Sequence, residues 1–174
     1  MPGLKIFITG GVKSGKSAYA LKLGQELGVK HAFIATATAG DDEMARKIAM
    51  HKAERAGRWQ TFEEPCDIAT ALRKAALDHD MVLIDCMTLW VSNLLTLQNF
   101  GDDEIEAVFS GFMEALHNAA CSIIIVTNEV GLGILPADRL SRRYQNLLGA
   151  LNRRIAGAAD SVYVMVSGIP VKIK

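Results

Sequence analysis

Residues 4–27, LKIFITGGVKSGKSAYALKLGQEL, decide the fold that this chain can adopt. The stretch opens with an apolar run typical of a buried strand and closes with an amphipathic segment typical of a helix. Between them, Gly10 to Ser17 match the whole pattern G-x-x-x-x-G-K-[ST]. We therefore predict a strand over 4–9, then a phosphate-binding loop (P-loop), then a helix over 17–27.

Each residue type in this loop has a physical task. Glycines let the backbone turn its amides toward an anion, and the N-terminus of a helix adds positive potential. We expect Lys16 to reach the β- and γ-phosphates of a nucleotide, and Ser17 to offer its hydroxyl to Mg²⁺. The predicted nucleotide-binding positions of the loop are Gly10, Gly11, Val12, Lys13, Ser14, Gly15, Lys16 and Ser17.

Beyond the loop, short apolar runs alternate with longer amphipathic stretches. The runs are apolar throughout, which indicates strands buried on both faces, as in a parallel sheet. The predicted strands are 4–9, 31–37, 81–85, 122–128 and 161–166, and the predicted helices are 17–27, 42–56, 67–78, 88–98, 102–119 and 138–158. The tail VYVMVSGIPVKIK is too short for a parallel crossover, so its last strand should return antiparallel.

These elements predict an α/β fold of the P-loop NTPase type. We expect a mostly parallel β-sheet flanked by helices, with an antiparallel C-terminal edge strand. No linker, repeat or low-complexity tract divides the sequence, so residues 1–174 are predicted to form a single nucleotide-binding catalytic domain.

Composition limits the classes of partner. The chain of 174 residues has 19 basic and 19 acidic side chains, so it offers no general field for nucleic acid or an anionic membrane. Cys66, Cys86 and Cys121 lack the spacing of a zinc or redox site, which favours reduced thiols. Neither a signal peptide nor a membrane-spanning run is recognisable, so we expect a cytoplasmic protein.

Polar residues stand at the carboxyl ends of two of the predicted buried strands. Asp85 ends MVLID, where a P-loop protein needs a carboxylate near its metal, although an aspartate that caps a turn or a helix would look the same. Asn128 and Glu129 leave SIIIVTN in a similar way. They either converge with the P-loop at the carboxyl edge of the sheet or only make local hydrogen bonds in their own loop.

A histidine stands within the stretch DDEMARKIAMHKAER, residues 41–55. Met44, Ile48, His51 and Arg55 share one face of the predicted helix. By periodicity alone, His51 can be a boundary residue that packs its ring. It can also be a nucleophile that holds a nucleotidyl group as a phosphoramidate, with Lys52 and Arg55 either balancing phosphoryl charge or forming a solvated face.

The chain resembles, over nearly its whole length, the bifunctional adenosylcobinamide kinase and adenosylcobinamide-phosphate guanylyltransferase family of cobalamin biosynthesis. The resemblance rests on TGGVKSGKS, FIATA followed by DDEMARKIAMHK, TNEVGLGILP, LNRRIAGAAD and VSGIPVKIK in this order. It implies phosphorylation of adenosylcobinamide by ATP or GTP, followed by GMP transfer from GTP to give adenosylcobinamide-GDP and pyrophosphate. It further implies a covalent guanylyl group on His51, Mg²⁺ at Ser17 and Asp85, and a homotrimer.

The resemblance also implies nucleotide-binding positions outside the P-loop. These positions are Ala35, Thr36, Ala37, Lys52, Ala53, Glu54, Arg55, Glu63 and Asp85. Three departures from the family pattern matter: Met50 replaces a second histidine of some relatives, Ala53 and Glu54 replace Asp-Gly, and Asp85 can be glutamate elsewhere. The shorter carboxylate of Asp85 can bind Mg²⁺ through water. The polar segment 37–42 is a predicted hinge for the His51 helix.

Two other functions fit the P-loop. A simple small-molecule kinase would phosphorylate its substrate without a covalent nucleotide adduct. A regulatory GTP-binding module would switch conformation instead, although the N-K-x-D run of many regulatory GTPases is missing. The subunit interface is not readable, because Trp90, Leu94 and Phe100 suit a core and an interface equally well.

Overall fold

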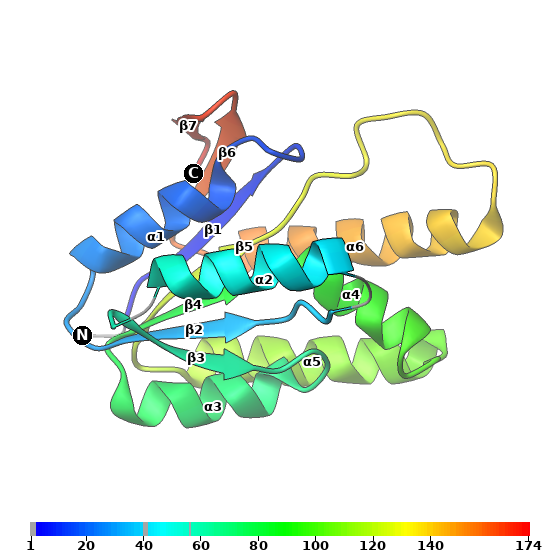
Figure 1. Cartoon of the computed structure of the whole chain (residues 1–174). Helices are drawn as coiled ribbons and strands as arrows, with labels where there is room; N and C mark the ends of the chain where they lie inside the picture. The colour runs from blue at the N-terminus through cyan, green and yellow to red at the C-terminus, as the bar shows by residue number, and fades with distance from the viewer. Residues whose placement is uncertain (1–2, 40–41, 56) are drawn as a thin grey trace.

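The computed structural model describes residues 3–39, 42–55 and 57–174. Its strands and helices alternate for most of the chain (Figure 1). In chain order they are β1 (Lys5–Gly10), α1 (Lys16–Glu26), β2 (His31–Ala35), α2 (Asp42–Arg55), β3 (Trp59–Glu63), α3 (Ile68–Asp78), β4 (Met81–Asp85), α4 (Met87–Thr96), α5 (Asp102–Asn118), β5 (Ser122–Val126), α6 (Arg139–Ala158), β6 (Ser161–Val166) and β7 (Ile169–Lys172).

The described strands form one seven-stranded sheet in the order β3-β2-β4-β5-β1-β6-β7. All neighbouring pairs are parallel except β6 and β7, which pair antiparallel at the edge. The predicted mostly parallel sheet with an antiparallel C-terminal edge is confirmed. Pro170 lies in the edge strand β7, where a missing amide donor costs little.

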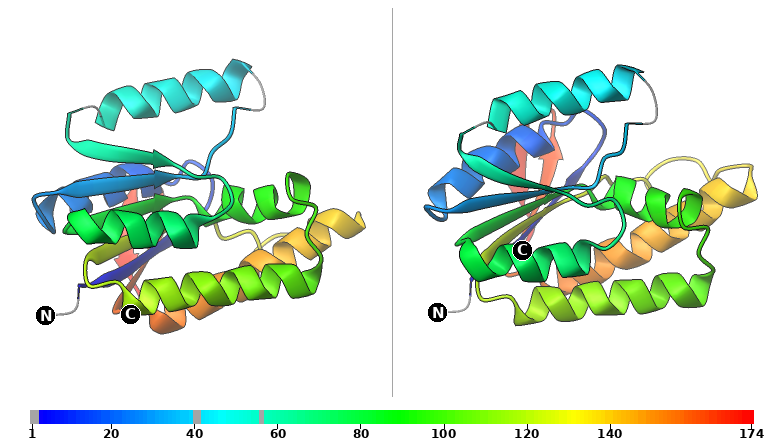
Figure 2. Two further views of the ribbon diagram at one scale, coloured as in Figure 1. Left: turned by 90° about the horizontal axis from the view of Figure 1, so that it is seen from below. Right: turned by 60° about the horizontal axis from the view of Figure 1, so that its bottom comes forward.

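Helices cover both faces of the sheet. Helices α1 and α2 lie on one face, and α3, α4, α5 and α6 lie on the other (Figures 1 and 2). Side chains alternate accordingly along β1, because Phe7 packs in the cluster with α3 to α6 while Ile6 and Ile8 pack in the cluster with α1. Burial on both faces explains the continuous apolar runs of the sequence.

Strand β3 was not predicted from the sequence. Its residues WQTFE have no continuous apolar run, because β3 is an edge strand and Gln60 and Glu63 are exposed. Trp59 is its buried anchor and packs against α1 at Gly24, where an added Cβ would lie 2.6 Å from Cη2 of Trp59. The absence of a side chain at position 24 therefore permits this close approach.

Trp90, Leu94 and Phe100, which suited a core and an interface equally well, belong mostly to the core. Trp90 is 0% exposed and Leu94 is 1% exposed, so neither can form part of an open interface. Phe100 is half-buried and packs against the same cluster. Cys66, Cys86 and Cys121 form no disulfides in the structure. Along the described ranges, the structure contains no helix that is both long and apolar enough to cross a membrane.

Asp67 begins α3 by accepting a hydrogen bond from the Thr70 backbone amide at 3.1 Å. Asp67→Ala removes this cap and should lower the free energy of unfolding by about 1 kcal/mol. Urea unfolding followed by circular dichroism measures the change. Asp67→Asn keeps an acceptor oxygen and should recover most of the loss, whereas an equal loss in both variants would contradict the capping role.

Candidate functional site

The loop between β1 and α1 has the backbone conformation that its glycines permit. The φ angles are +143° at Gly10, +56° at Lys13 and +90° at Gly15. A Cβ atom at Gly10 would lie 2.5 Å from the Met165 carbonyl oxygen, so position 10 requires glycine for space as well as for conformation. Gly15 is the N-cap of α1, which places the loop at the positive end of a helix.

Neighbouring elements hold this loop on two sides. The Gly168 amide, in the turn between β6 and β7, donates to the Ser14 carbonyl at 3.0 Å. The Glu129 amide, just after β5, donates to the Gly10 carbonyl at 3.1 Å. The loop is therefore fixed before any ligand arrives, which reduces the entropy lost on binding.

Lys16 is 8% exposed and lies within the loop. Its Nζ donates to the Gly11 carbonyl at 2.5 Å and approaches Ser14 Oγ at 3.4 Å. Burial lowers the pKa of Lys16, while electrostatic interaction with Asp85 and Cys86 opposes that shift. An anionic phosphate in the loop would act in the same direction as Asp85 and favour the ammonium form.

A cavity of about 220 Å³ opens beside Ser17 and Asp85. Its walls come from α1, β2, α2 and β4, which the sheet order brings together at one edge. The predicted site residues that line it are Ser17, Ala35, Ala37, Arg55 and Asp85. The predicted metal residues and several predicted nucleotide contacts thus surround one space.

The residues at this cavity suit Mg²⁺. A serine hydroxyl and an aspartate carboxylate are hard oxygen donors, and Mg²⁺ in nucleotide sites typically takes only one or two protein ligands besides phosphates and water. Within the described part of the chain, no group of three or more His, Cys, Asp or Glu side chains could hold a metal ion by itself. The neighbouring Cys86 stays a neutral thiol, because burial, together with Asp85, raises its pKa to about 11.

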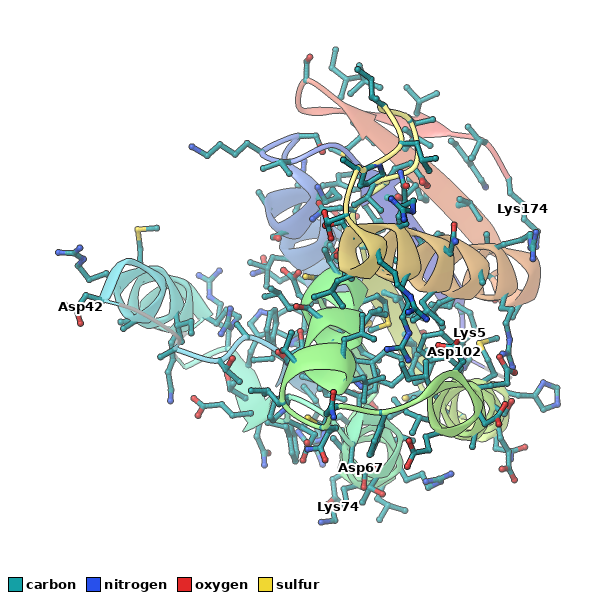
Figure 3. All side chains as sticks on the ribbon, turned by 90° about the vertical axis from the view of Figure 1, so that its right-hand side faces the viewer. Lys5, Asp42, Asp67, Lys74, Asp102 and Lys174 are labelled. Atoms are coloured by element: carbon teal, nitrogen blue, oxygen red, sulfur yellow. The ribbon has the colours of Figure 1, made fainter. Side chains whose placement is uncertain are left out.

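Helix α2 forms the outer wall of this cavity. Ile48 and Arg55, which share the predicted face of His51, both line it. Arg55 is 6% exposed, and its Cζ lies 3.6 Å from the centroid of the Phe33 ring on β2, a cation–π contact. Figure 3 shows Asp42, the first residue of α2, at the opposite margin of the molecule from Lys174.

Several predictions on α2 fall outside the described residues. The backbone of His51 belongs to α2, but the side chains of His51, Glu54 and Met44 are not described, nor are residues 40 and 41 of the predicted hinge. Lys52 is described, and its Nζ lies 2.7 Å from Glu63 Oε1, with 59% and 60% of the two side chains exposed. Ala53 is exposed.

The polar exit of β5 lies beside the P-loop. The Glu129 amide holds the P-loop at the Gly10 carbonyl, and the Asn128 amide donates to Thr88 Oγ1 on α4 at 2.9 Å. Thr127 is fully buried and donates from Oγ1 to Asn152 Oδ1 at 3.0 Å. Asn152 on α6 was not identified from the sequence, because no local motif marks a helix residue that reaches a distant strand end.

A second, larger cavity of about 870 Å³ lies on the other side of the P-loop. It runs between the loop, β6 and α6, and its lining is mostly apolar. Polar residues in it include Lys13, Glu129 and Arg153. Exposed apolar side chains at its rim are Val12, Leu132, Val166 and Ile173. Only the tertiary structure brings these four segments together.

Solved structures share this architecture. The RadB recombinase aligns with a TM-score of 0.52 at 17% identity, over 94% of this chain and 74% of that chain. An ATP synthase subunit, NeqB, from Nanoarchaeum equitans aligns with a TM-score of 0.55 at 14% identity, over 94% of this chain and 45% of that chain. At such identities the likeness concerns the fold alone.

Sequence relatives are much closer. The chain is 40% identical over 171 residues to the bifunctional adenosylcobalamin biosynthesis protein CobP of Pseudomonas aeruginosa, covering 98% of both chains. It is 36% identical to CobU, of the same description, from Salmonella typhimurium, covering 98% of this chain and 100% of that protein. A family model described as cobinamide kinase / cobinamide phosphate guanyltransferase matches residues 6–173. The chain therefore belongs to the cobinamide kinase / cobinamide phosphate guanyltransferase family.

Proposed function

We propose that this chain catalyses both reactions for which its family is named, and that the second passes through a guanylyl group on His51. It first phosphorylates the hydroxyl of adenosylcobinamide with ATP or GTP, then transfers GMP from GTP to the new phosphate. The observation that carries the proposal is the cavity lined by Ser17 and Asp85, with α2 across from the P-loop helix α1. The helix with the predicted nucleophile thus borders the predicted phosphate site.

The P-loop binds the nucleotide phosphates in both reactions. Its amides and Lys16 hold the β- and γ-phosphates and stabilise the charge that develops as a phosphate bond breaks. Bound at Ser17 and Asp85, Mg²⁺ would supply further positive charge to the same oxygens. Room for a bulky acceptor exists beside the loop, where the cavity of about 870 Å³ has mostly apolar walls.

Guanylyl transfer proceeds in two balanced displacements. A neutral imidazole nitrogen of His51 attacks the α-phosphorus of GTP, forming a P–N bond as the bond to the β-phosphate oxygen breaks and pyrophosphate leaves. A phosphate oxygen of adenosylcobinamide phosphate then attacks the same phosphorus, the P–N bond breaks, and adenosylcobinamide-GDP leaves with His51 restored.

The charges around α2 support this chemistry. Arg55 lies at the cavity, and Lys52 is held at the surface by Glu63 in a pair that is largely exposed. An exposed pair of this kind is worth about 1 kcal/mol or less, so a phosphoryl group can replace Glu63 as the partner of Lys52 at little cost. Ala35, Ala37, Ala53 and Glu54 complete the proposed nucleotide contacts, whereas Thr36, which was predicted with them, is fully buried.

Three further features belong to the same proposal. The active enzyme is a homotrimer, it acts in the cytoplasm, and residues 1–174 work as one catalytic domain.

Intact-protein mass spectrometry after incubation with GTP and Mg²⁺ tests the covalent step. We expect a mass gain of one guanylyl moiety that is labile in acid, absent from His51→Ala and absent when ATP replaces GTP. His117 on α5 is exposed and outside the site, so His117→Ala is the matched control and should acquire the adduct normally.

The outcomes separate the proposal from its competitors. An adduct retained in His51→Ala would place the nucleophile elsewhere. Phosphorylated cobinamide without any adduct would indicate a simple kinase, and GTP binding with neither product would indicate a regulatory module.

Lys16→Ala should reduce kcat/KM of both reactions at least about 10²-fold, because it removes a charge directed at the developing phosphate oxygens. Steady-state rates with cobinamide and with cobinamide phosphate measure the two reactions separately. Lys22 is an exposed lysine on the same helix, and Lys22→Ala should stay close to wild type. A Lys16→Ala enzyme that keeps either rate would remove the P-loop from that reaction.

A further inference from the structure

Three predicted contact residues lie side by side at the ends of three strands. In the sheet register, Ala35 of β2 pairs with Glu63 of β3 on one side and with Asp85 of β4 on the other. Asp85 lines the cavity from the last position of β4, so the chain around the ends of β2 and β4 surrounds its backbone.

Thr36 extends the β2–β4 ladder by one residue past Asp85. Its amide donates to the Asp85 carbonyl at 3.2 Å. Its Oγ1 donates to the Cys86 carbonyl and accepts from the Cys86 amide, both at 2.8 Å. The Thr36 hydroxyl thus bonds both backbone groups of Cys86, as the carbonyl and amide of a neighbouring strand would. The main chain at the end of β4 is therefore hydrogen-bonded to Thr36 at Asp85 and again at Cys86.

Asn93 of α4 makes further hydrogen bonds to the ends of these strands. It is 6% exposed, and its Nδ2 donates to the Thr36 carbonyl at 2.8 Å and to the Pro65 carbonyl at 3.0 Å. Both partners are acceptors, so the amide orientation follows from chemistry: the opposite orientation would set three oxygens against one another. Asn93 therefore joins the exits of β2 and β3.

These contacts place a polar side chain on an otherwise apolar helix face. Trp90, Val91 and Leu94 make the inner face of α4 a core face, so the amide at position 93 carries a desolvation cost that its two hydrogen bonds offset. Thr36 is 0% exposed, and its amide, hydroxyl and carbonyl are all used in holding strand ends. The polar groups are directed at the strand exits that carry the predicted site residues.

We propose that Asn93 and Thr36 are positioning residues that set the Asp85 carboxylate where it meets the metal of the P-loop nucleotide. The inference rests on the metal role of Asp85 in the proposed function. Thr36 itself, being fully buried, then acts through Asp85 instead of touching the nucleotide.

The test is the Mg²⁺ concentration that gives half-maximal binding of a fluorescent GTP analogue to the full chain. Thr36→Val removes the hydroxyl at nearly constant shape and should raise this midpoint about tenfold, a typical loss when the support of a metal ligand is removed. Thr36→Ser restores a hydroxyl and should recover most of the affinity. Binding in EDTA should be unaltered in Thr36→Val, because the P-loop is untouched.

A second variant and a control complete the design. Asn93→Leu suits the core and should shift the Mg²⁺ midpoint in the same direction, which keeps the test available if Thr36→Val does not fold. Thr96 lies exposed at the end of α4, so Thr96→Val should leave the midpoint alone. Thermal melts show that each variant is folded at the assay temperature.

Asp85→Asn separates the positioning role of Thr36 and Asn93 from the metal role of Asp85 itself. A midpoint that shifts in Asp85→Asn but not in Thr36→Val or Asn93→Leu would overturn the positioning role alone and leave these residues with a purely structural function. An unshifted midpoint in Asp85→Asn would overturn the metal role of Asp85 and this inference with it.

Discussion

Parallel pairing of β2, β4, β5, β1 and β6 is the constraint on which the rest of the structure depends. Parallel strands place all their carboxyl ends at one edge, so residues that leave different strands meet there although they are far apart in sequence. Lys16, Asp85 and Glu129 reach the same region for this reason. An antiparallel arrangement of the same strands would send half of these residues to the other edge.

The sheet order also gives the P-loop two different sides. On one side, Ser17 of α1 and Asp85 of β4 supply hard oxygen donors, and α2 forms a wall of the same cavity. On the other side, β6 and β7 supply apolar side chains and a turn whose Gly168 amide holds the loop. The two cavities beside the loop therefore differ in polarity: one has a hydroxyl and a carboxylate in its wall, and the other has mostly apolar walls.

Two buried asparagine side chains hold the ends of strands in place. Asn152 holds the exit of β5, and Asn93 holds the exits of β2 and β3, each from the core side of a helix. A buried amide is costly unless its hydrogen bonds are made, so both residues commit the nearby loops to one arrangement. The walls of the phosphate site are fixed in this way, while α2 is joined to them through the segment after Thr36.

The sequence by itself determined the α/β class, the phosphate-binding loop, the antiparallel last strand and most element boundaries. Each of these follows from local chemistry: glycine and lysine spacing, apolar runs, and a tail too short to cross over. Helix α2 and the positions of Ser17 and Asp85 at strand and helix ends were predictable for the same reason. Family resemblance, not spacing, singled out His51.

Only the tertiary structure decided the remaining features. Strand β3 was missed because an edge strand alternates and carries charge, so it lacks the apolar run of a central strand. Whether Trp90 and Leu94 were core or interface depended on the rest of the core, in which Trp90 packs against Phe109 and Phe112 of α5, and no local pattern reports such contacts. Asn93, Thr36 and Asn152 act through partners 24 to 57 residues away. Such contacts exist only once the sheet has formed, because its register sets which strand ends are neighbours.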